Sequence, residues 1–375
     1  MTDTDRKIIL CSCEDTMALD PKAVGAGCKG AHIATARHLC RSEIGLFRKN
    51  AVEGNLTIAC TQESALFEEV AEDDKLAAAL SFVNVRETAG WSREGARAAP
   101  KMAALIAAAG EAEEPHPIVS YESEGVTLVL GRDATALGAA QQLKDRLDIT
   151  VVLTVGADVV PPRHADFPVR QGRVRTATGH LGAFEITLDQ FDAPAASSRA
   201  KLVFGKGQDG AVSKADIIID LSGGKPLFAA HELREGYLRA DPANPAEVQK
   251  ALFRAADLVG TFDKPRYINF RETLCAHARS KKVGCTRCLD LCPAGAIIPA
   301  GTHVSIDPYV CGGCGQCAAA CPTGAASYVM PTADALLRRL RALLAAYRAA
   351  GGRNAQVLIH DGDHGAALID AAARF

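Results

Sequence analysis

Short apolar runs separated by turn-forming residues recur along the first two-thirds of the chain. Residues 7–10, 55–59, 126–130 and 149–154 are such runs. Apolar runs of this length, bounded by turn signals, are typical of strands buried in a parallel sheet. Because helical stretches alternate with them, we predict an α/β fold spread over several domains.

The first domain is expected to span residues 1–116 and to have α/β structure. Between its strands at 7–10 and 55–59, the pattern of residues 31–47 favours a helix that contains Cys40 or ends near it. Such an order, strand then helix then strand, is typical of a parallel sheet.

Five cysteines lie in this domain. Cys11 and Cys13 follow the first predicted strand, and Cys60 follows the second. Open α/β sheets place ligands at the carboxyl ends of their strands, so these thiols are candidates for a binding site. Cys28 and Cys40 are the remaining two that can come within reach.

Residues 117–262 are expected to form a second, Rossmann-like domain. The strand at 126–130 is followed by a helix that runs to Leu147 and then by the strand at 149–154. This is a β-α-β order. A dinucleotide-binding domain has the sequence G-x-G-x-x-G/A in the turn that opens such a helix.

The turn here is a degenerate form of that fingerprint. Gly131, Ala136 and Gly138 are the candidate binding residues, but Asp133 replaces the middle glycine and Thr154 stands where an acidic residue would bind the ribose. An aspartate adds bulk and negative charge where a pyrophosphate would lie. FAD is therefore not expected, and a flavin bound at these three residues is the alternative.

Eight of the thirteen cysteines lie in residues 263–330, the third domain. Its second half has the spacing C-x2-C-x2-C-x3-C-P, which is typical of bacterial [4Fe-4S] ferredoxins. The residues are Cys311, Cys314, Cys317 and Cys321, followed by Pro322. A similar run in the first half contains Cys285, Cys288 and Cys292, so we predict an α+β ferredoxin domain with two clusters.

The ligands of the two clusters follow from a rule of such domains, in which the fourth cysteine of each run binds the other cluster. One cluster then takes Cys292, Cys311, Cys314 and Cys317. The other takes Cys285, Cys288 and Cys321 and needs one more ligand. The expected position holds Lys282, so Cys275 is the nearest replacement.

Paired C-x2-C units also suit tetrahedral zinc, which is the alternative to clusters here. The three-residue final gap and the proline after each run favour cubanes. Gly312, Gly313 and Gly315 favour them too, because glycine lets the backbone approach a cluster closely.

Several short features of the first domain are shared with one known family. They are the C-x-C pair at Cys11 and Cys13, Cys40 with Ser42, and Ala59 with Cys60. In these features the domain resembles the amino-terminal domain of the A subunit of heterodisulfide reductases, and residues 117–262 resemble the flavin-binding domain that follows in those subunits. Residues 83–91 continue the likeness, although Ala89 stands where the family has cysteine.

This resemblance and the clustering of five cysteines predict a third [4Fe-4S] cluster. Its expected ligands are Cys13, Cys28, Cys40 and Cys60, with Cys11 as a competitor. The alternative is that these thiols are small buried apolar side chains.

The last segment, residues 331–375, contains a predicted amphipathic helix at 333–349, a strand at 357–359 and a helix at 366–373. This pattern predicts the start of a C-terminal α/β domain. It suggests a truncated piece of a longer protein.

Composition narrows the function. Hydrophobic residues make up 48% and charged residues 23% of the chain, which is typical of globular proteins, and the formal net charge of -2 argues against nucleic acid. No apolar run approaches the ~20 residues that a bilayer requires, so we expect no membrane insertion and a cytoplasmic location. Thirteen cysteines in a reducing compartment indicate metal or redox ligands.

The order of the domains resembles ferredoxin-like proteins found with bacterial formate dehydrogenases and with heterodisulfide reductases. This resemblance implies electron relay between a molybdenum or tungsten dehydrogenase, such as formate dehydrogenase, and an acceptor. We predict an electron-transfer component of an oxidoreductase rather than a stand-alone enzyme. The alternatives are a flavin-dependent heterodisulfide-reductase-like subunit and a nonredox assembly or sensor protein that carries clusters.

Overall fold

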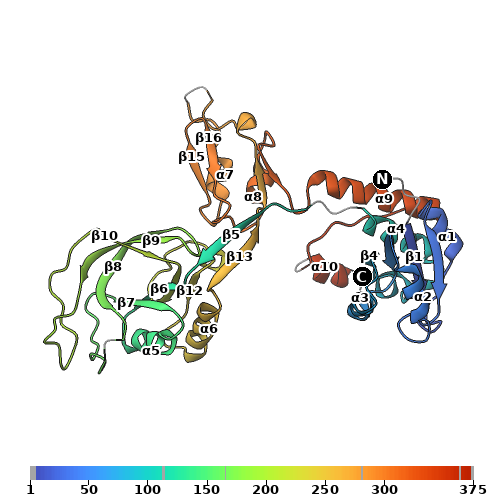
Figure 1. Ribbon diagram of the computed structural model, residues 1–375. Helices are drawn as coiled ribbons and strands as arrows, with labels where there is room; N and C mark the ends of the chain where they lie inside the picture. The colour runs from blue at the N-terminus through green and yellow to red at the C-terminus, as the bar shows by residue number, and fades with distance from the viewer. Residues whose placement is uncertain (1–5, 112–114, 165, 280–281, 363–364, 373–375) are drawn as a thin grey trace. The chain divides into compact units, whose positions relative to one another are not determined.

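The computed structural model describes residues 6–111, 115–164, 166–279, 282–362 and 365–372. The chain divides into two compact units, whose elements are coloured along the sequence in Figure 1. One unit contains Met1–Glu114 and Ala333–Phe375, and the other contains Pro115–Thr332.

The first unit is built on a four-stranded parallel sheet with the order β2-β1-β3-β4. The strands are β1 (Arg6–Cys11), β2 (His32–Ala36), β3 (Asn55–Ile58) and β4 (Ala79–Phe82). Ile8, Ile9 and Leu10 of the central strand β1 are fully buried, as their apolar run predicts. Because all four strands run in one direction, the loops that follow them meet along one edge of the sheet.

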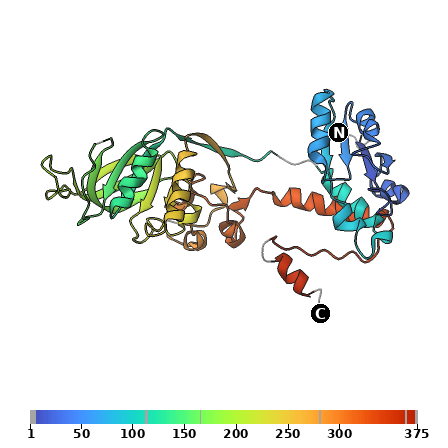
Figure 2. The same ribbon diagram turned by 90° about the horizontal axis from the view of Figure 1, so that it is seen from below.

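Helices cover both faces of this sheet, as Figure 2 shows from a second direction. They are α1 (Pro21–Gly27), α2 (Ile44–Asn50), α3 (Ser64–Asp73) and α4 (Ala99–Ala109), with short turns η2 (Arg86–Gly90) and η3 (Gly95–Arg97) before α4. Ile8 packs with Val24 of α1 and Met102 of α4, whereas Ile9 packs with Phe47 of α2 and Phe67 of α3. Alternate residues of β1 thus fill two separate cores.

The predicted helix at residues 31–47 is wrong. His32–Ala36 forms β2, and a turn-rich segment leads from it to α2 at Ile44. The strand forms because α1 already supplies the crossover after β1, so the next segment can pair with β1 in parallel. Cys40 consequently lies in a loop after a strand.

The carboxyl-terminal segment belongs to the first unit rather than to a fourth domain, which corrects the prediction for residues 331–375. α9 (Ala333–Ala349) has the predicted bounds and lies against α4 and α1. A Cβ at Gly27 would come within 2.9 Å of the Ala346 carbonyl oxygen, so α1 and α9 are in close contact. The amphipathic helix α9 thus packs against this unit's own helices, with Ala346 buried at the contact.

The predicted strand at residues 357–359 is also wrong. Val357, Leu358 and Ile359 have no strand partner within the described part of the chain and are exposed. α10 (Gly365–Ala372) follows them, close to the predicted helix.

The second unit contains a seven-stranded sheet with the order β10-β9-β8-β7-β6-β11-β12. The strands are β6 (Val126–Gly131), β7 (Asp148–Leu153), β8 (Val169–Thr178), β9 (Phe184–Asp192), β10 (Ala211–Ala215), β11 (Ile217–Leu221) and β12 (Tyr237–Arg239). Along the sheet from β8 through β7, β6 and β11 to β12, each strand is parallel to its neighbour. At the other end, β9 and β10 pair in an antiparallel manner and form one edge of the sheet. Helices α5 (Ala134–Leu143) and α6 (Pro245–Ala256) share one core with this sheet. The predicted order of strand, helix and strand is confirmed by β6, α5 and β7.

An antiparallel pair, β5 (Ile118–Ser123) with β13 (Gly260–Pro265), joins the seven-stranded part to the cysteine-rich part. The expected domain boundary after residue 262 therefore falls within β13. The cysteine-rich part has the paired strands β14 (Ile268–Phe270) with β17 (Ala326–Tyr328) and β15 (Ile297–Ala300) with β16 (His303–Ile306), the helices α7 (Arg287–Leu291) and α8 (Gln316–Ala320), and the turn η5 (Glu272–Leu274). A further short turn, η4 (His231–Leu233), precedes β12.

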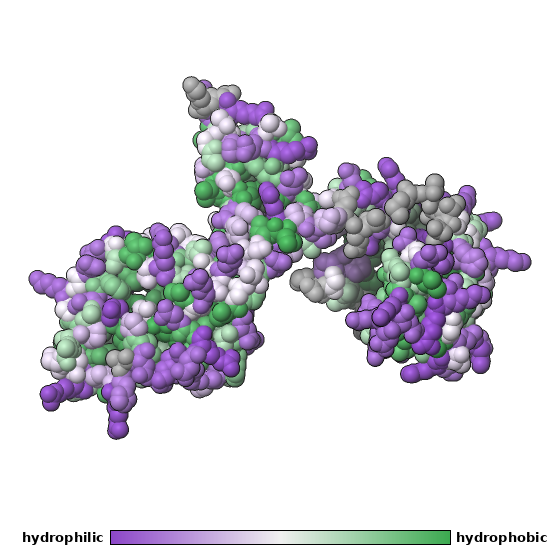
Figure 3. Space-filling model, viewed as in Figure 1, coloured by the Kyte–Doolittle hydropathy of each residue, from purple (hydrophilic) through white to green (hydrophobic). Residues whose placement is uncertain are grey.

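The surface of each unit is mixed in polarity. Figure 3 shows hydrophilic side chains projecting from the visible face of both units, with apolar side chains between them. Within the described ranges, no helix combines the length and the apolar character needed to cross a bilayer.

Candidate metal centres

Four of the predicted ligands line one cavity in the cysteine-rich part, which we call site 1. They are Cys275, Cys285, Cys288 and Cys321. Cys288 lies on α7, and Cys321 directly follows α8. Much of the remaining wall is apolar and includes Phe270 and Val304. Site 1 is thus a small cavity with four thiols on its surface.

Cys275 reaches site 1 because the loop that follows it folds back to Cys285. The backbone amide of Cys285 donates to the Ala276 carbonyl at 3.2 Å, and the amide of Gly284 donates to the His277 carbonyl at 2.6 Å. The buried His277 also places its Nδ1 2.9 Å from the Cys285 carbonyl oxygen. These contacts bring Cys275 close to Cys285, although the two cysteines are farther apart in sequence than in the ferredoxin pattern.

The other four predicted ligands line a second cavity, which we call site 2. They are Cys292, Cys311, Cys314 and Cys317. Cys317 lies on α8, whereas Cys292 directly follows α7. The Sγ of Cys292 accepts a hydrogen bond from the Ala296 amide at 3.3 Å. Leu233 and Ile268 form part of the apolar wall.

Glycines allow the backbone to follow the wall of site 2. Gly313 has φ +74°, and a Cβ there would lie 2.9 Å from the ring of Tyr267. Gly315, with φ +72°, begins α8 in the same left-handed region. A side chain at Gly313 is therefore excluded both by backbone strain and by the aromatic ring.

Burial and hydrogen bonding shift the pKa of some of these thiols in opposite directions. Burial raises the pKa of Cys317 to about 11 and also raises the pKa of Cys311. Burial acts on Cys321 in the same sense, but hydrogen bonds from Ala326 and Thr323 outweigh it and lower the pKa of this thiol below its usual value. Buried thiols become thiolates most easily beside a positive centre, so the donor set fits a metal cluster.

The thiols of each site surround a cavity. This arrangement fits a cubane, in which each cysteine binds a different iron.

Two cations that the sequence does not single out lie beside site 2. Lys264 donates from Nζ to the Tyr309 carbonyl and to the Tyr121 hydroxyl, both at 2.8 Å. Arg234 donates to the Ala294 carbonyl at 2.7 Å. Both cations are half-buried. No motif marks them, because only folding brings β13 and the loop before β12 to these cysteines.

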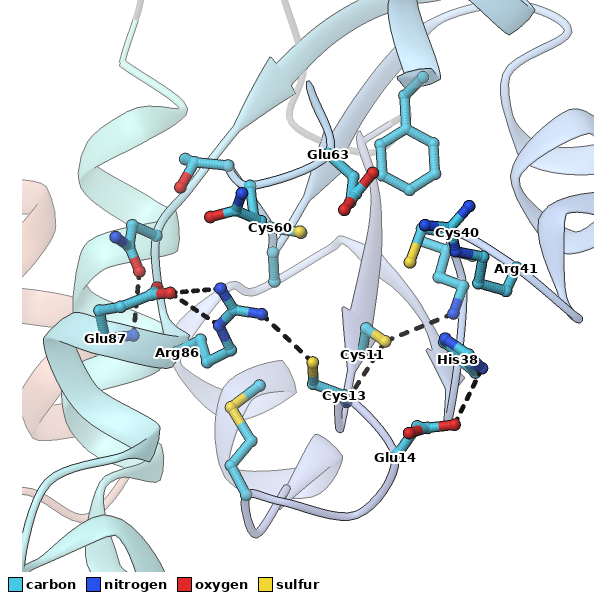
Figure 4. A pocket seen from close by; sticks show the side chains of 17 residues that line it. Cys11, Cys13, Glu14, His38, Cys40, Arg41, Cys60, Glu63, Arg86 and Glu87 are labelled. Atoms are coloured by element: carbon cyan, nitrogen blue, oxygen red, sulfur yellow. Dashed lines mark hydrogen bonds and ion pairs between the residues drawn. The ribbon is translucent and has the colours of Figure 1, made fainter. Parts of the chain in front are cut away.

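Four cysteines of the first unit line a pocket at the carboxyl edge of its sheet, as Figure 4 shows. Cys11 ends β1 and Cys13 follows it, while Cys40 and Cys60 follow β2 and β3. The Sγ of Cys11 accepts hydrogen bonds from the amide of Cys13 at 3.4 Å and from the amide of Leu39 at 3.5 Å. We call this the amino-terminal thiol pocket.

Cys28 lies outside this pocket, which corrects the predicted ligand set. It follows α1, is 6% exposed, and its Sγ lies 3.7 Å from the Ala103 carbonyl oxygen of α4. A crossover helix returns the chain to the opposite edge of a parallel sheet, so the end of α1 lies away from Cys11 and Cys13. Cys11, the expected competitor, lines the pocket together with Cys13, Cys40 and Cys60.

Two arginines, Arg41 and Arg86, line the amino-terminal thiol pocket, and Arg86 contacts one of its thiols. The Nη1 of Arg86 donates to the Sγ of Cys13 at 3.3 Å, and its guanidinium stacks 4.4 Å from the centroid of the Trp91 ring. A hydrogen bond with Glu87 is the main cause of the raised pKa of Arg86. Arg86 also begins η2, which is a π-helical turn, and such turns are frequent at functional sites.

The backbone of the pocket is strained next to Cys13. Cys13, Glu14 and Asp15 have φ angles of +52°, +59° and +63°. A run of three non-glycine residues in the left-handed region is costly and persists only where the surroundings impose it. Here it turns the chain so that both cysteines of the C-x-C pair face one pocket.

In the structure, residues of the candidate nucleotide site pack β6 against α5 and cap the start of α5. A Cβ at Gly131 would lie 2.1 Å from the Cβ of Ala136, so Gly131 is needed where β6 packs against α5. Asp133 is the N-cap of α5, and its Oδ1 accepts from the Thr135 amide at 2.9 Å. Gly138 has open space where its Cβ would be. The carboxylate of Asp133 thus occupies the helix end that a pyrophosphate would use.

Comparison with known proteins identifies the cysteine-rich part. Residues 281–325 match the family model of a 4Fe-4S dicluster domain. This part is a dicluster ferredoxin domain. The match implies two [4Fe-4S] clusters, and seven of the eight cysteines of sites 1 and 2 lie within the matched residues, whereas Cys275 lies before them.

Two proteins illustrate the likeness. An uncharacterized ferredoxin of Methanocaldococcus jannaschii is 41% identical over 51 residues, which are 12% of this chain and 66% of that ferredoxin, so the chain spans slightly less than two-thirds of its length. A crystal structure of an oxidoreductase from Agrobacterium tumefaciens matches with 20% identity over 31% of this chain and 42% of that chain. Its TM-score is 0.18, which supports no conclusion.

Proposed function

We propose that this protein relays electrons between a dehydrogenase and an acceptor through [4Fe-4S] clusters. The observation that carries the proposal is that four thiols surround each of two cavities in a dicluster ferredoxin domain. A [4Fe-4S] cluster supplies reversible one-electron chemistry when it is bound. The protein then contributes ligation, spacing and the surroundings of the cluster.

The residues of each site have separate roles in this proposal. Cys275, Cys285, Cys288 and Cys321 hold one cluster at site 1, and Cys292, Cys311, Cys314 and Cys317 hold the other at site 2. The apolar walls, which include Phe270 at site 1 and Ile268 at site 2, shield part of each cavity from water. The Ala296 amide stabilises negative charge on the Cys292 sulfur.

A third cluster in the first unit is part of the proposal. Its ligands are Cys11, Cys13, Cys40 and Cys60, which come from the ends of three neighbouring strands. Arg86 offsets the negative charge of the thiolates through Cys13. The strained turn at Cys13 supports a binding role, because strain of this kind is common at functional sites.

The proposal excludes a flavin and includes a protein partner. Asp133 would place a carboxylate against the pyrophosphate of FAD. The partner is a redox enzyme such as formate dehydrogenase, which rests on the resemblance in domain order. The location is a reducing compartment such as the cytoplasm, where cysteines stay reduced and are available as cluster ligands.

The test is anaerobic purification followed by iron and acid-labile sulfide analysis and EPR of the reduced protein. We expect about twelve irons per chain for three cubanes, or about eight if only the ferredoxin domain is loaded. Reduction by dithionite and reoxidation should be reversible. A protein that binds zinc instead, or clusters that do not reduce, would contradict electron transfer and favour a structural or sensor role. A flavin absorbance would contradict the role given to Asp133.

A further inference from the structure

We propose that Lys264 and Arg234 raise the reduction potential at site 2 above that at site 1, so that one electron shared by the ferredoxin domain resides mainly at site 2. The inference rests on the proposed function and adds a preferred position for the electron. Reduction adds a negative charge to a cluster, and a nearby buried cation stabilises that charge.

Lys264 is the first of the two cations. Its Nζ is held by the Tyr309 carbonyl and the Tyr121 hydroxyl, both at 2.8 Å, and Tyr309 lies two residues before Cys311. These two hydrogen bonds hold the ammonium group beside the segment that leads into Cys311.

Arg234 is the second cation. It donates to the Ala294 carbonyl at 2.7 Å, two residues after Cys292, and to the Gly179 carbonyl at 2.7 Å. Its guanidinium also lies 4.4 Å from the centroid of the Phe228 ring. These contacts fix a permanent charge beside a second sulfur of site 2.

Cations are also present at site 1, but they face solvent. Arg287 lines that cavity and Arg279 donates to the Cys275 carbonyl at 2.8 Å, yet both are exposed. Solvent and salt screen exposed charges far more than half-buried ones. Backbone amide hydrogen bonds do not account for a difference in reduction potential between the two sites, because sulfurs at both sites accept such bonds.

Two carboxylates oppose the cations at site 2. Asp307 interacts with both Lys264 and Arg234, and Glu235 interacts with Lys264. Both carboxylates are exposed, and Asp307 also accepts from the Tyr309 amide at 2.8 Å. The half-buried cations therefore dominate the field at the sulfurs.

The electron transfer is balanced within the domain. With clusters bound at both sites, an electron given up at site 1 would be taken up at site 2, and no proton would be required. A one-electron donor, which is dithionite in the test, supplies the electron. Site 2 then holds the electron next to the seven-stranded part, since Leu233 of the loop before β12 is in its wall.

The experiment is an EPR-monitored redox titration of the full chain and of matched variants. Lys264→Gln removes the charge and keeps a hydrogen-bond donor, and Lys264→Arg keeps the charge. Arg234→Gln tests the second cation independently. Two variants serve as controls. Lys214→Gln removes one positive charge from an exposed residue of β10, and Arg287→Gln removes an exposed cation at site 1. Iron content and thermal melting verify that each variant is folded and loaded.

We expect Lys264→Gln and Arg234→Gln each to lower the higher midpoint potential, with about a tenfold fall in the reduced-to-oxidised ratio at fixed potential, or about 59 mV. Lys264→Arg should restore it, and Lys214→Gln and Arg287→Gln should leave it nearly unchanged. The same shift should persist when Cys275→Ser and Cys285→Ser together remove the cluster at site 1.

The inference is overturned if both midpoints move equally, if the lower midpoint moves, or if the shifted signal disappears with site 1. A failure of the proposed function has a different signature. In that case the unaltered protein has no iron and sulfide, or has no reducible signal, before any variant is compared.

Discussion

Cys292 and Cys321 occupy equivalent positions after α7 and α8, and each lines the cavity whose other thiols come largely from the opposite half of the repeat. The backbone is extended at both residues, with φ -76° and ψ 106° at Cys292 and φ -71° and ψ 111° at Cys321. Each helix therefore serves both sites. The two sites share a scaffold, but their remaining ligands are separate, so they can be removed one at a time.

Replacing a cysteine that lines only one of the two sites should remove the cluster from that site alone. Cys314 is exposed and belongs to site 2, and Cys275 is buried and belongs to site 1. We expect Cys314→Ser or Cys275→Ser each to lower iron by about four per chain, because serine is a poor ligand for a cubane. Iron and sulfide analysis with EPR measures the loss.

Cys28→Ser is the matched control, because Cys28 lies outside all three thiol-lined cavities. Cys28→Ser should destabilise the protein, because the side chain is buried, and should leave the iron content per chain unchanged. Unchanged iron in Cys275→Ser would show that site 1 does not use the cysteine before the long loop.

The amino-terminal thiol pocket should lose its cluster without affecting the ferredoxin domain. Cys60 lies at the end of β3 in the first unit, whereas sites 1 and 2 lie in the second. We expect Cys60→Ser to lower iron from about twelve to about eight per chain and to leave both ferredoxin EPR signals intact. Equal iron in Cys60→Ser and the unaltered protein would mean that this pocket holds no cluster.

The sequence predicts the ferredoxin domain well because ligand spacing is a local property. The runs that end at Cys292 and Cys321 specify a helix, a terminal cysteine and a proline, and the match at residues 281–325 supports the same domain. The helix at 333–349 is equally local, since its pattern alone sets its bounds. Its contact with α4 is not local, and the sequence contains no sign of it.

The errors come from choices that depend on neighbouring elements. His32–Ala36 is short and ambiguous, and it becomes a strand only because β1 offers a partner after α1. Because this segment is a strand, Cys40 follows β2 and lines the pocket. Cys28 lies at the end of α1, outside the pocket. Lys264 and Arg234 were missed for a similar reason, because a cation far away in sequence has no motif that relates it to a cysteine.

The pKa differences predict unequal thiol reactivity in the metal-free protein. Burial raises the pKa of Cys317 to about 11, whereas hydrogen bonds lower the pKa of Cys321 despite its burial. Thiolates react with iodoacetamide and thiols do not, so alkylation of Cys321 should begin at lower pH than alkylation of Cys317. Mass spectrometry of the two peptides across pH, normalised to each peptide's own maximum, removes the effect of exposure. Identical pH profiles would contradict the assigned hydrogen bonds of Cys321.

The N-cap role of Asp133 predicts a stability effect that is separate from metal binding. Its Oδ1 accepts from the Thr135 amide at 2.9 Å. Loss of such a cap costs about 1 kcal/mol, so Asp133→Ala should reduce the free energy of unfolding of the second unit by about that amount. Asp133→Asn keeps an acceptor and should cost much less, and Asp133→Gly should leave the iron content unchanged.

The pH dependence of the same cap has a defined sign. Burial raises the pKa of Asp133, but the hydrogen bond from Thr135 and the nearby Arg132 lower it overall below its usual value. A carboxyl whose pKa is lowered by folding stabilises the protein above its unfolded pKa and loses this contribution as the pH falls through the folded pKa. The side chain is 45% exposed, so the contribution is small. Urea unfolding of the unaltered protein and of Asp133→Asn should therefore differ at neutral pH and converge below about pH 4. A difference that grows on acidification would show that Asp133 is not the charged cap of α5.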